Sequence, residues 1–322
     1  MDDISKQKSA IEQEACKHAC ECPSDSSLSK PEVPIIIIER DDQPQTTTSV
    51  TRVVDPSRKQ KWMKRLLVLS AVGCLMVAIL AGYYFWNYYY NIGITVSVTP
   101  EQNIAKLQQP TKQEAPEIVM TSDSILGVAM DLYAIHGLKA SIEFNEPDTA
   151  DTSVYLYCRS ADFKADSTYI GSLVVNGKEY QSDRSRLGYM AMLDNNSVIG
   201  ISRSEKVKDF IGERGGSFFR QFILVSDGII PSRFFLHGKV ERRAIGRIND
   251  QLYFIATRHK ETLWDFADAL REYGFIDAIY ITGGADYCFY RSKDGVRHDI
   301  GDSVDYPHEK WKGIIPWLVF RK

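Results

Sequence analysis

The sequence predicts an α+β fold with a mixed, mostly antiparallel sheet and few helices, preceded by one transmembrane helix and a disordered N-terminal tail. Three observations predict it. Short runs of β-branched and aromatic residues alternate with turn signals beyond residue 123. One amphipathic helix pattern interrupts these runs near residue 260. An uncharged stretch over residues 66–86 follows a polar N-terminal segment.

The N-terminal segment, residues 1–61, is rich in charged residues, Ser, Thr, Gln and Pro, and its one apolar run is the isoleucine run at 35–38. Such a composition buries too little apolar surface to offset chain entropy, so we expect a disordered tail. Cys16, Cys20 and Cys22 lie beside His18 in this tail. Their spacing matches no standard zinc finger. They either bind a soft metal in another arrangement or remain reduced thiols.

A transmembrane anchor is expected over residues 62–90. The uncharged stretch 66–86 is about 30 Å long as a helix, which matches the hydrocarbon core of a bilayer; a buried core helix is the alternative. Basic residues precede the stretch, namely Arg58, Lys59, Lys61, Lys64 and Arg65, whereas the next one after it is Lys106. The positive-inside rule therefore predicts a single-pass protein with a cytoplasmic N-terminus and an extracytoplasmic C-terminal domain. Because signal peptides lie within about the first 30 residues, we expect the span to be uncleaved.

A polar, Pro-containing linker is expected over residues 91–122, and the extracytoplasmic domain over 123–322. Turn residues such as those at 176–178, 194–197 and 226–228 separate the predicted strands of that domain. The predicted strands cover 128–135, 139–144, 153–158, 169–175, 188–193, 197–202, 222–225, 233–237, 242–246, 252–257 and 276–281.

The clearest helix pattern is "KETLWDFADALREYG" at 260–274, whose apolar residues recur at spacings of three and four. Thr262 can cap its start and Gly274 can end it in a left-handed conformation. A shorter helix is expected at 204–211. The strand 276–281 then leads to Gly283 and Gly284. Two glycines at a strand end allow backbone to approach a ligand closely, although they are also common in hairpin loops.

The order of these elements resembles the C-terminal core of the phosphodiester glycosidase family, the N-acetylglucosamine-1-phosphodiester alpha-N-acetylglucosaminidase-like domain. The family's Arg-x-Ala-Ile-Gly segment is similar to residues 242–246, and its closing strand is similar to "IIPWLVFRK" at 314–322. Its Asp-Gly-Gly-Gly-Ser segment corresponds to Thr282, Gly283, Gly284, Ala285 and Asp286. The resemblance covers about residues 125–322. The chain departs from the pattern at both ends of this last segment, with Thr282 in place of Asp and Asp286 in place of Ser.

The resemblance implies hydrolysis of a sugar-1-phosphodiester of a glycan or glycoconjugate. Such a reaction needs a carboxylate that activates water or stabilises an oxocarbenium-like transition state, and donors for the phosphate. We expect Asp286 and Thr282 to be catalytic, although Asp286 alternatively caps a turn. An arginine fork suits phosphate, so the expected substrate-binding residues are Arg242, Gly283, Gly284, Arg220, Arg243 and His237. A domain that binds a glycan or a protein without turnover is the alternative, because Thr282 replaces the family's aspartate.

Other functional classes lack support. The net charge of -3 gives no basic field, so a nucleic-acid partner is not expected. No Walker loop, dinucleotide fingerprint, His-Glu-x-x-His or Gly-x-Ser-x-Gly motif is present, and we predict neither a cofactor nor a metal. The predicted partners are the lipid bilayer and a carbohydrate phosphodiester, with protein partners unknown. Cys158 and Cys288 either form a disulfide or remain buried thiols.

Overall fold

The computed structural model of the chain describes residues 56–90, 93–94, 98–111, 114–234, 236–284, 286–301 and 313–322. The chain divides within its longest helix into two units, Met1–Val68 and Leu69–Lys322, and every described strand belongs to the second unit. The tail predicted over 1–61 lies outside the described residues, apart from the residues that begin this helix. The cysteines of the tail are outside them as well.

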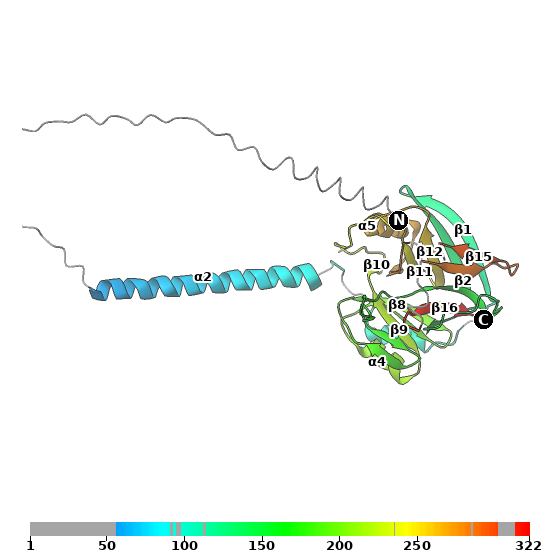
Figure 1. The fold of residues 1–322 in the computed structure, drawn as a ribbon, viewed down its shortest axis with the longest axis horizontal. Coiled ribbons are helices and arrows are strands. Elements are labelled where there is room, and N and C mark those ends of the chain that lie inside the picture. The colour runs from blue at the N-terminus through cyan, green and yellow to red at the C-terminus, as the bar shows by residue number, and fades with distance from the viewer. Residues whose placement is uncertain are drawn as a thin grey trace, which may run out of the picture. The chain divides into compact units, whose positions relative to one another are not determined.

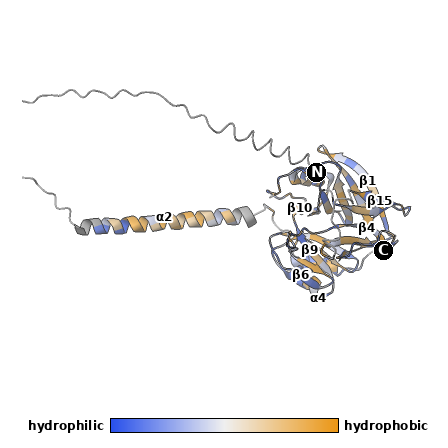
Figure 2. Ribbon diagram, in the orientation of Figure 1, coloured by the Kyte–Doolittle hydropathy of each residue, from blue (hydrophilic) through white to orange (hydrophobic). Residues whose placement is uncertain are grey.

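The longest helix is α2 (Pro56–Tyr90). Its segment Gln60–Trp86 is long and apolar enough to cross a membrane, by length and composition. Figure 2 shows hydrophobic residues along most of α2 and hydrophilic ones at its start. Membrane anchors and signal sequences contain helices of this length and composition.

The strands of the second unit form three sheets, in which every pairing between described strands is antiparallel (Figure 1). The fold is therefore α+β with mostly antiparallel sheets, as the sequence predicted. The first sheet has the order β1 (Glu117–Ile125), β2 (Val128–His136), β12 (Gln251–Thr257), β11 (Arg243–Ile248), β13 (Asp277–Ile281), β10 (Ile223–Val225). The second has the order β15 (Arg297–Ile300), β14 (Cys288–Arg291), β4 (Val154–Arg159), β16 (Trp317–Arg321), β3 (Lys139–Glu143). The third has the order β6 (Lys178–Gln181), β5 (Leu173–Val175), β9 (Ser217–Gln221), β7 (Gly188–Leu193), β8 (Asn196–Ile201).

Three short helices complete the described part of the second unit: α3 (Pro100–Leu107), α4 (Lys206–Glu213) and α5 (Leu263–Tyr273). The start of α5 is capped by Thr262, whose hydroxyl accepts a hydrogen bond from the Asp265 amide at 3.0 Å. Its end is formed by Gly274, with a φ of 109° that glycine adopts without steric cost. Both features agree with the prediction from the sequence.

The main hydrophobic core contains side chains from all three sheets, including Ile245 and Ile281 of the first, Cys158 and Cys288 of the second and Phe219 of the third. A second cluster fills the opposite face of the first sheet, where α5 packs on Ala244 and Tyr280. Neighbouring residues of one strand therefore belong to different clusters, because successive side chains of a strand point to opposite faces. This alternation decides where the arginines of β11 point.

Several elements differ from those predicted. The strand predicted at 233–237 is wrong, because its described residues form a loop in which Phe234 packs edge-to-face on Trp264 instead of pairing with a strand. The segment predicted as a linker contains α3, where buried Asn103 donates to the Tyr189 hydroxyl, and the start of β1. The strands β1, β6, β9 and β15 were not predicted, since their mixed polar sequences give a weak strand signal.

Gly246 in β11 provides a test of this packing. A Cβ at Gly246 would lie 2.6 Å from Cδ1 of Phe275, a ring that is itself held between Tyr253 and Tyr273. We expect Gly246→Ala to lower the free energy of unfolding by about 1–3 kcal/mol, as overpacking does. Urea unfolding of the full chain in detergent, followed by circular dichroism, measures it.

The control is Gly212→Ala in α4, where the nearest atom to the added Cβ is 3.7 Å away. Alanine is the better helix former, so this variant should be as stable as the parent or more stable by up to about 1 kcal/mol. Equal destabilisation by the two substitutions would contradict the packing described for Phe275.

Candidate functional site

The candidate site lies where β13 ends. Ile281, the last residue of β13, pairs with Arg243 at the start of β11. Thr282, Gly283 and Gly284 follow, and Asp286 precedes β14 by two residues. The first and second sheets meet here, because β11 and β13 belong to one and β14 to the other. The arrangement brings charged residues from distant parts of the sequence to one place.

The two glycines have different roles in the backbone. A Cβ at Gly283 would lie 2.4 Å from the Glu241 carbonyl oxygen and 2.9 Å from the Tyr280 hydroxyl, so Gly283 is required by close packing. The amide of Gly284 donates to the same Glu241 carbonyl at 2.7 Å. Gly284 has a φ of 81°, and a Cβ there would meet nothing within 4 Å. Gly284 is thus the open position of the pair.

Arg242 and Arg243 are both buried, but they face opposite sides of the first sheet. The Arg242 side chain lies on the α5 side, with its guanidinium 5.8 Å from the centre of the Tyr280 ring. Its Nε donates to the Glu261 carbonyl at 2.8 Å, and its Nη2 donates to the Gly238 carbonyl. Arg242 therefore joins two loop segments. Its Nε and Nη2 already donate to backbone carbonyls, so these two atoms are not available to a phosphate.

Arg243 points into the space between the first and second sheets. A Cβ added to Gly301 would lie 2.8 Å from Arg243 Nη2 and 2.6 Å from the Asp286 carbonyl oxygen, which places these two residues side by side. The Nη1 atom of Arg243 is buried and has no hydrogen-bond partner among the described residues. An unpaired buried guanidinium nitrogen is costly, so this atom is a candidate for pairing with a ligand.

Asp286 is 7% exposed, and Arg159, the last residue of β4, is equally buried. Nη1 of Arg159 lies 3.4 and 3.5 Å from the two carboxylate oxygens of Asp286. Its Nη2 lies 4.0 Å from Asp162, which in turn accepts a hydrogen bond from Gln221 at 3.2 Å. The Asp286 carboxylate thus lies against the Arg159 guanidinium at a place with little solvent.

Thr282 is also buried, and its hydroxyl oxygen has no partner among the residues that the structure describes. It follows directly on the residue that pairs with Arg243. Two buried polar atoms without partners, Arg243 Nη1 and Thr282 Oγ1, therefore occur at the same end of the β11–β13 pair. A buried polar side-chain atom without a protein partner calls for an explanation, and a bound water, ion or ligand is one.

Cys158 and Cys288 flank this region as fully buried free thiols. Burial raises the pKa of Cys288 to about 11; the nearby Arg243 opposes this shift, and the negative charges of Asp286 and Asp299 add to it. Burial likewise raises the pKa of Cys158 well above its usual value, against the opposing effect of Arg243. Both thiols are therefore protonated at neutral pH, which makes them poor nucleophiles.

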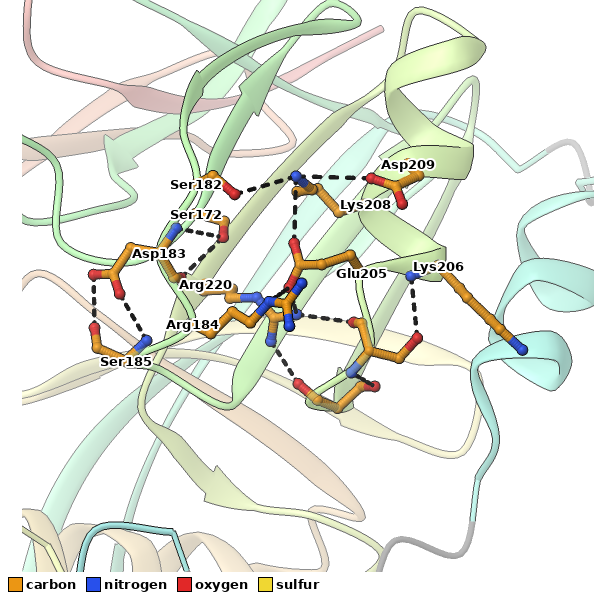
Figure 3. A network of polar contacts seen from close by, with 12 residues as sticks. Ser172, Ser182, Asp183, Arg184, Ser185, Glu205, Lys206, Lys208, Asp209 and Arg220 are labelled. Carbon is orange, nitrogen blue, oxygen red and sulfur yellow. Dashed lines mark hydrogen bonds and ion pairs between the residues drawn. The ribbon is translucent and has the colours of Figure 1, made fainter.

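Arg220 lies in a separate network on the third sheet (Figure 3). It is 0% exposed; its Nη1 donates to the Ser202 carbonyl at 2.6 Å, and its Nη2 donates to the Ser204 carbonyl and to Glu205, both at 3.0 Å. Figure 3 also shows Lys208, whose Nζ lies 3.3 Å from the other carboxylate oxygen of Glu205. These bonds connect β9 to the start of α4, so we assign Arg220 a role in holding the third sheet and α4 together.

His237 lies in the exposed loop before β11, where it lines a pocket of about 460 Å³ together with Trp264 and Thr262. The structure therefore brings Arg243, Asp286, Thr282 and Gly284 to one end of β13. Arg220 and His237 belong to other parts of the unit. Among the described residues no group of three His, Cys, Asp or Glu side chains is arranged to hold a metal ion.

Sequence reasoning missed Arg159. The signal was present, since Arg159 directly follows the apolar run "VYLYC" at 154–158. A charged residue at the end of a fully buried strand must find a partner there. What the sequence does not reveal is that the end of β4 meets Asp286 across the sheets.

Comparison with known proteins finds no matching family model and no matching curated protein. Among solved structures, the chain is similar to the catalytic domain of zebrafish N-acetylglucosamine-1-phosphodiester alpha-N-acetylglucosaminidase, auto-inhibited by its pro-peptide. The identity is 14% and the TM-score 0.47, over 67% of this chain and 86% of that one. A hypothetical protein from Synechocystis is similar at 10% identity and a TM-score of 0.45, over 64% of this chain and 62% of that one.

Both identities are below 25% and both TM-scores are below 0.5. At these identities the similarity concerns the fold. The function of this chain therefore has to be argued from its own residues.

The network around Arg220 gives a stability prediction. Glu205→Ala removes the carboxylate that faces buried Arg220 and Lys208. Removal of one partner of a buried ion pair typically costs about 3–5 kcal/mol, because the other charge stays buried. We expect a loss of that size in urea unfolding. Glu213→Ala is the control, because its side chain is 76% exposed and lies 3.9 Å from Arg214, so it should change little.

The thiols give a chemical prediction. Because Cys158 and Cys288 are buried and protonated, iodoacetamide at neutral pH should leave both unmodified in the folded chain and alkylate both in urea without reductant. Peptide mass mapping reads the modification. Alkylation in urea that appears only after a reductant is added would instead reveal a disulfide between them.

Proposed function

We propose that the chain is a single-pass membrane protein whose part beyond α2 is an extracytoplasmic, phosphodiester glycosidase-like hydrolase. Its substrate class is a sugar-1-phosphodiester of a glycan or glycoconjugate. One observation carries the proposal: the buried Arg243 guanidinium has an Nη1 atom without a partner among the described residues, and it lies beside Asp286. A phosphodiester oxygen is the kind of acceptor that such a donor requires.

Arginine suits this position better than lysine, because its planar fork presents two parallel donors to two phosphate oxygens. The burial of Arg243 also strengthens its attraction to an anion, since little water competes for the charge. The resemblance of residues 125–322 to the phosphodiester glycosidase family supports a phosphate that is esterified to the anomeric carbon of a sugar.

The proposed reaction breaks the bond between the anomeric carbon and the phosphate oxygen. Water supplies its oxygen to the sugar, and its remaining proton leaves with the phosphate monoester or with a base. A phosphate monoester is already a good leaving group, so the main requirement is stabilisation of the cationic sugar and activation of water. Asp286 is assigned both tasks. Arg159 orients the Asp286 carboxylate, with its Nη1 at 3.4 and 3.5 Å from the two carboxylate oxygens.

The other residues at the end of β13 have supporting roles in this proposal. The Thr282 hydroxyl donates to the substrate, and the open backbone at Gly284 leaves room for a ligand to approach. Arg242 is a positioning residue, since it binds the carbonyls of Gly238 and Glu261 next to the segment that packs on Gly283. Arg220 and His237 are left out of the proposed site.

The membrane part of the proposal depends on α2. Its segment Gln60–Trp86 has the length and composition of a membrane span, and basic residues precede it but do not directly follow it. We therefore propose that α2 anchors the protein, with the N-terminus in the cytoplasm and the strands outside it.

A second function, binding of a glycan phosphodiester without turnover, is favoured by one observation. The residue at the position of the family's aspartate is Thr282, which carries no charge. The same guanidinium of Arg243 would serve a binding protein equally well. Only a measurement of turnover separates the two functions.

The test uses the full chain in detergent with a panel of sugar-1-phosphodiesters, and released sugar is assayed. We expect Asp286→Asn and Arg243→Lys each to lower kcat by about 10²–10³-fold, which is the usual effect of removing one charged or donor group from a transition state. The matched control is Arg271→Lys, an exposed arginine of α5 that pairs with Asp268 at 2.5 Å; it should leave kcat unchanged.

Each variant also needs an unfolding curve like that of the parent, so that a lower kcat can be attributed to the altered group and not to loss of the fold. Normal turnover in both folded site variants would remove Asp286 and Arg243 from the active site. If no member of the panel releases sugar but one binds saturably, the binding function replaces the hydrolase.

A further inference from the structure

A second surface of the unit carries features that the proposed reaction does not use. It consists of the loop before β11 and the start of α5, and we call it the loop–helix patch. Its pocket, of about 460 Å³, is lined by Ser232, Arg233, Phe234, Leu236, His237, Thr262 and Trp264. Large apolar side chains are unusually exposed around it: Leu236 is 41%, Trp264 47% and Val240 37% exposed. Exposed apolar groups that gather in this way mark an interaction surface.

The patch is built into the fold. The Phe234 ring lies edge-to-face with Trp264, with ring centres 6.0 Å apart. Val240 and Glu261 exchange backbone hydrogen bonds of 3.3 and 2.8 Å. Arg242 joins the same two segments from below through the carbonyls of Gly238 and Glu261. Hydrogen bonds thus hold the backbone that carries the exposed side chains of the patch.

The patch carries charges of both signs: Arg233, Lys239 and Lys260 are basic, and Glu241, Glu261 and Asp265 are acidic. The segment "IIPSRFFLHGKV" at 229–240 contains Arg233 and Lys239 and no carboxylate. Lys260 is also exposed, three residues after the end of β12. Glu261 lies 3.8 Å from Lys239, whose side chain is 63% exposed, and Asp265 accepts a hydrogen bond from Thr262. Aromatic and aliphatic side chains with a basic rim are the composition of surfaces that lie in a lipid headgroup layer.

The chain itself limits how far this patch can be from α2. Gly93 lies against Ser232, since a Cβ at Gly93 would be 2.7 Å from the Ser232 hydroxyl oxygen. The helix ends at Tyr90, three residues earlier. Three extended residues span at most about 11 Å. Gly93 therefore lies within about 11 Å of the end of α2, and Ser232 is in contact with Gly93.

We propose that the loop–helix patch docks on the headgroup layer of the bilayer that α2 crosses, with Trp264 and Leu236 inserted and Arg233 and Lys239 on anionic lipid phosphates. The inference rests on the membrane anchoring in the proposed function. Docking would add a second contact to the one between Arg203 and Trp86 of α2, whose ring centre is 5.9 Å from the guanidinium carbon of Arg203. The partner is the lipid surface, and a protein partner is an outcome that the test can return.

The experiment uses the full chain reconstituted in vesicles of phosphatidylcholine, with or without phosphatidylglycerol. A photoreactive p-benzoylphenylalanine replaces Leu236, and in a second variant Val240, so that the result does not depend on one substitution. The control replaces Val296, which is 55% exposed in the turn between β14 and β15, at the end of β14 away from Asp286. Mass spectrometry identifies what is cross-linked after irradiation.

We expect lipid adducts at 236 and 240 and none at 296. Each basic side chain near an anionic surface strengthens binding by about fivefold, so phosphatidylglycerol should raise the adduct yield. Arg233→Gln with Lys239→Gln should abolish that increase. Adducts to protein at 236, or no adduct at either position, would overturn docking on lipid.

Extraction with alkaline carbonate separates this failure from failure of the anchor. A chain that stays in the vesicles but gives no lipid adduct contradicts the docking surface alone. A chain that carbonate releases contradicts the anchor, and the docking surface with it.

Discussion

The structure depends on one constraint of extended backbone: Arg242 directly precedes β11 and Arg243 is its first residue, so the two side chains point to opposite faces of the sheet. One guanidinium lies with α5 and binds two loop carbonyls, whereas the other lies between the sheets beside Asp286. Because β11 is flanked by β12 and β13, its register is fixed on both sides. A shift by one residue would exchange the two arginines and leave both without their surroundings.

This constraint links the candidate site to the loop–helix patch. Glu241 precedes the two arginines, and its carbonyl accepts the Gly284 amide while packing against Gly283. Arg242 then fixes Gly238 and Glu261, which are next to residues that line the pocket. Three consecutive residues thus hold the end of β13, the loop before β11 and the start of α5. A change in that segment should affect both regions together.

Local sequence signals predicted much of the fold. The helix α5 was predictable because a cap, an apolar stripe and a terminal glycine agree, and the strand pairs with strong apolar character were predictable as well. Weak strand signals gave wrong predictions where tertiary contacts determine the local structure. The segment at 233–237 has the composition of a strand, but Phe234 packs on Trp264 instead. β1 lacks a strand pattern because six consecutive residues of this edge strand are exposed on both faces.

The candidate site shows the same limit more sharply. The sequence identified the glycine pair, Asp286 and three buried arginines, but it ranked Arg242 before Arg243, since resemblance to a motif does not reveal which face a side chain leaves from. It also could not assign Arg220, because a buried arginine is needed equally by a phosphate site and by the carbonyl network of the third sheet. What distinguishes the three arginines is whether protein acceptors already occupy their donors. Both Nη atoms of Arg220 donate to protein acceptors, although its Nε has none, and Nε and Nη2 of Arg242 donate to backbone carbonyls. Nη1 of Arg243 has no acceptor within the described part of the chain and lies beside Asp286, so we rank Arg243 first as a ligand-binding residue.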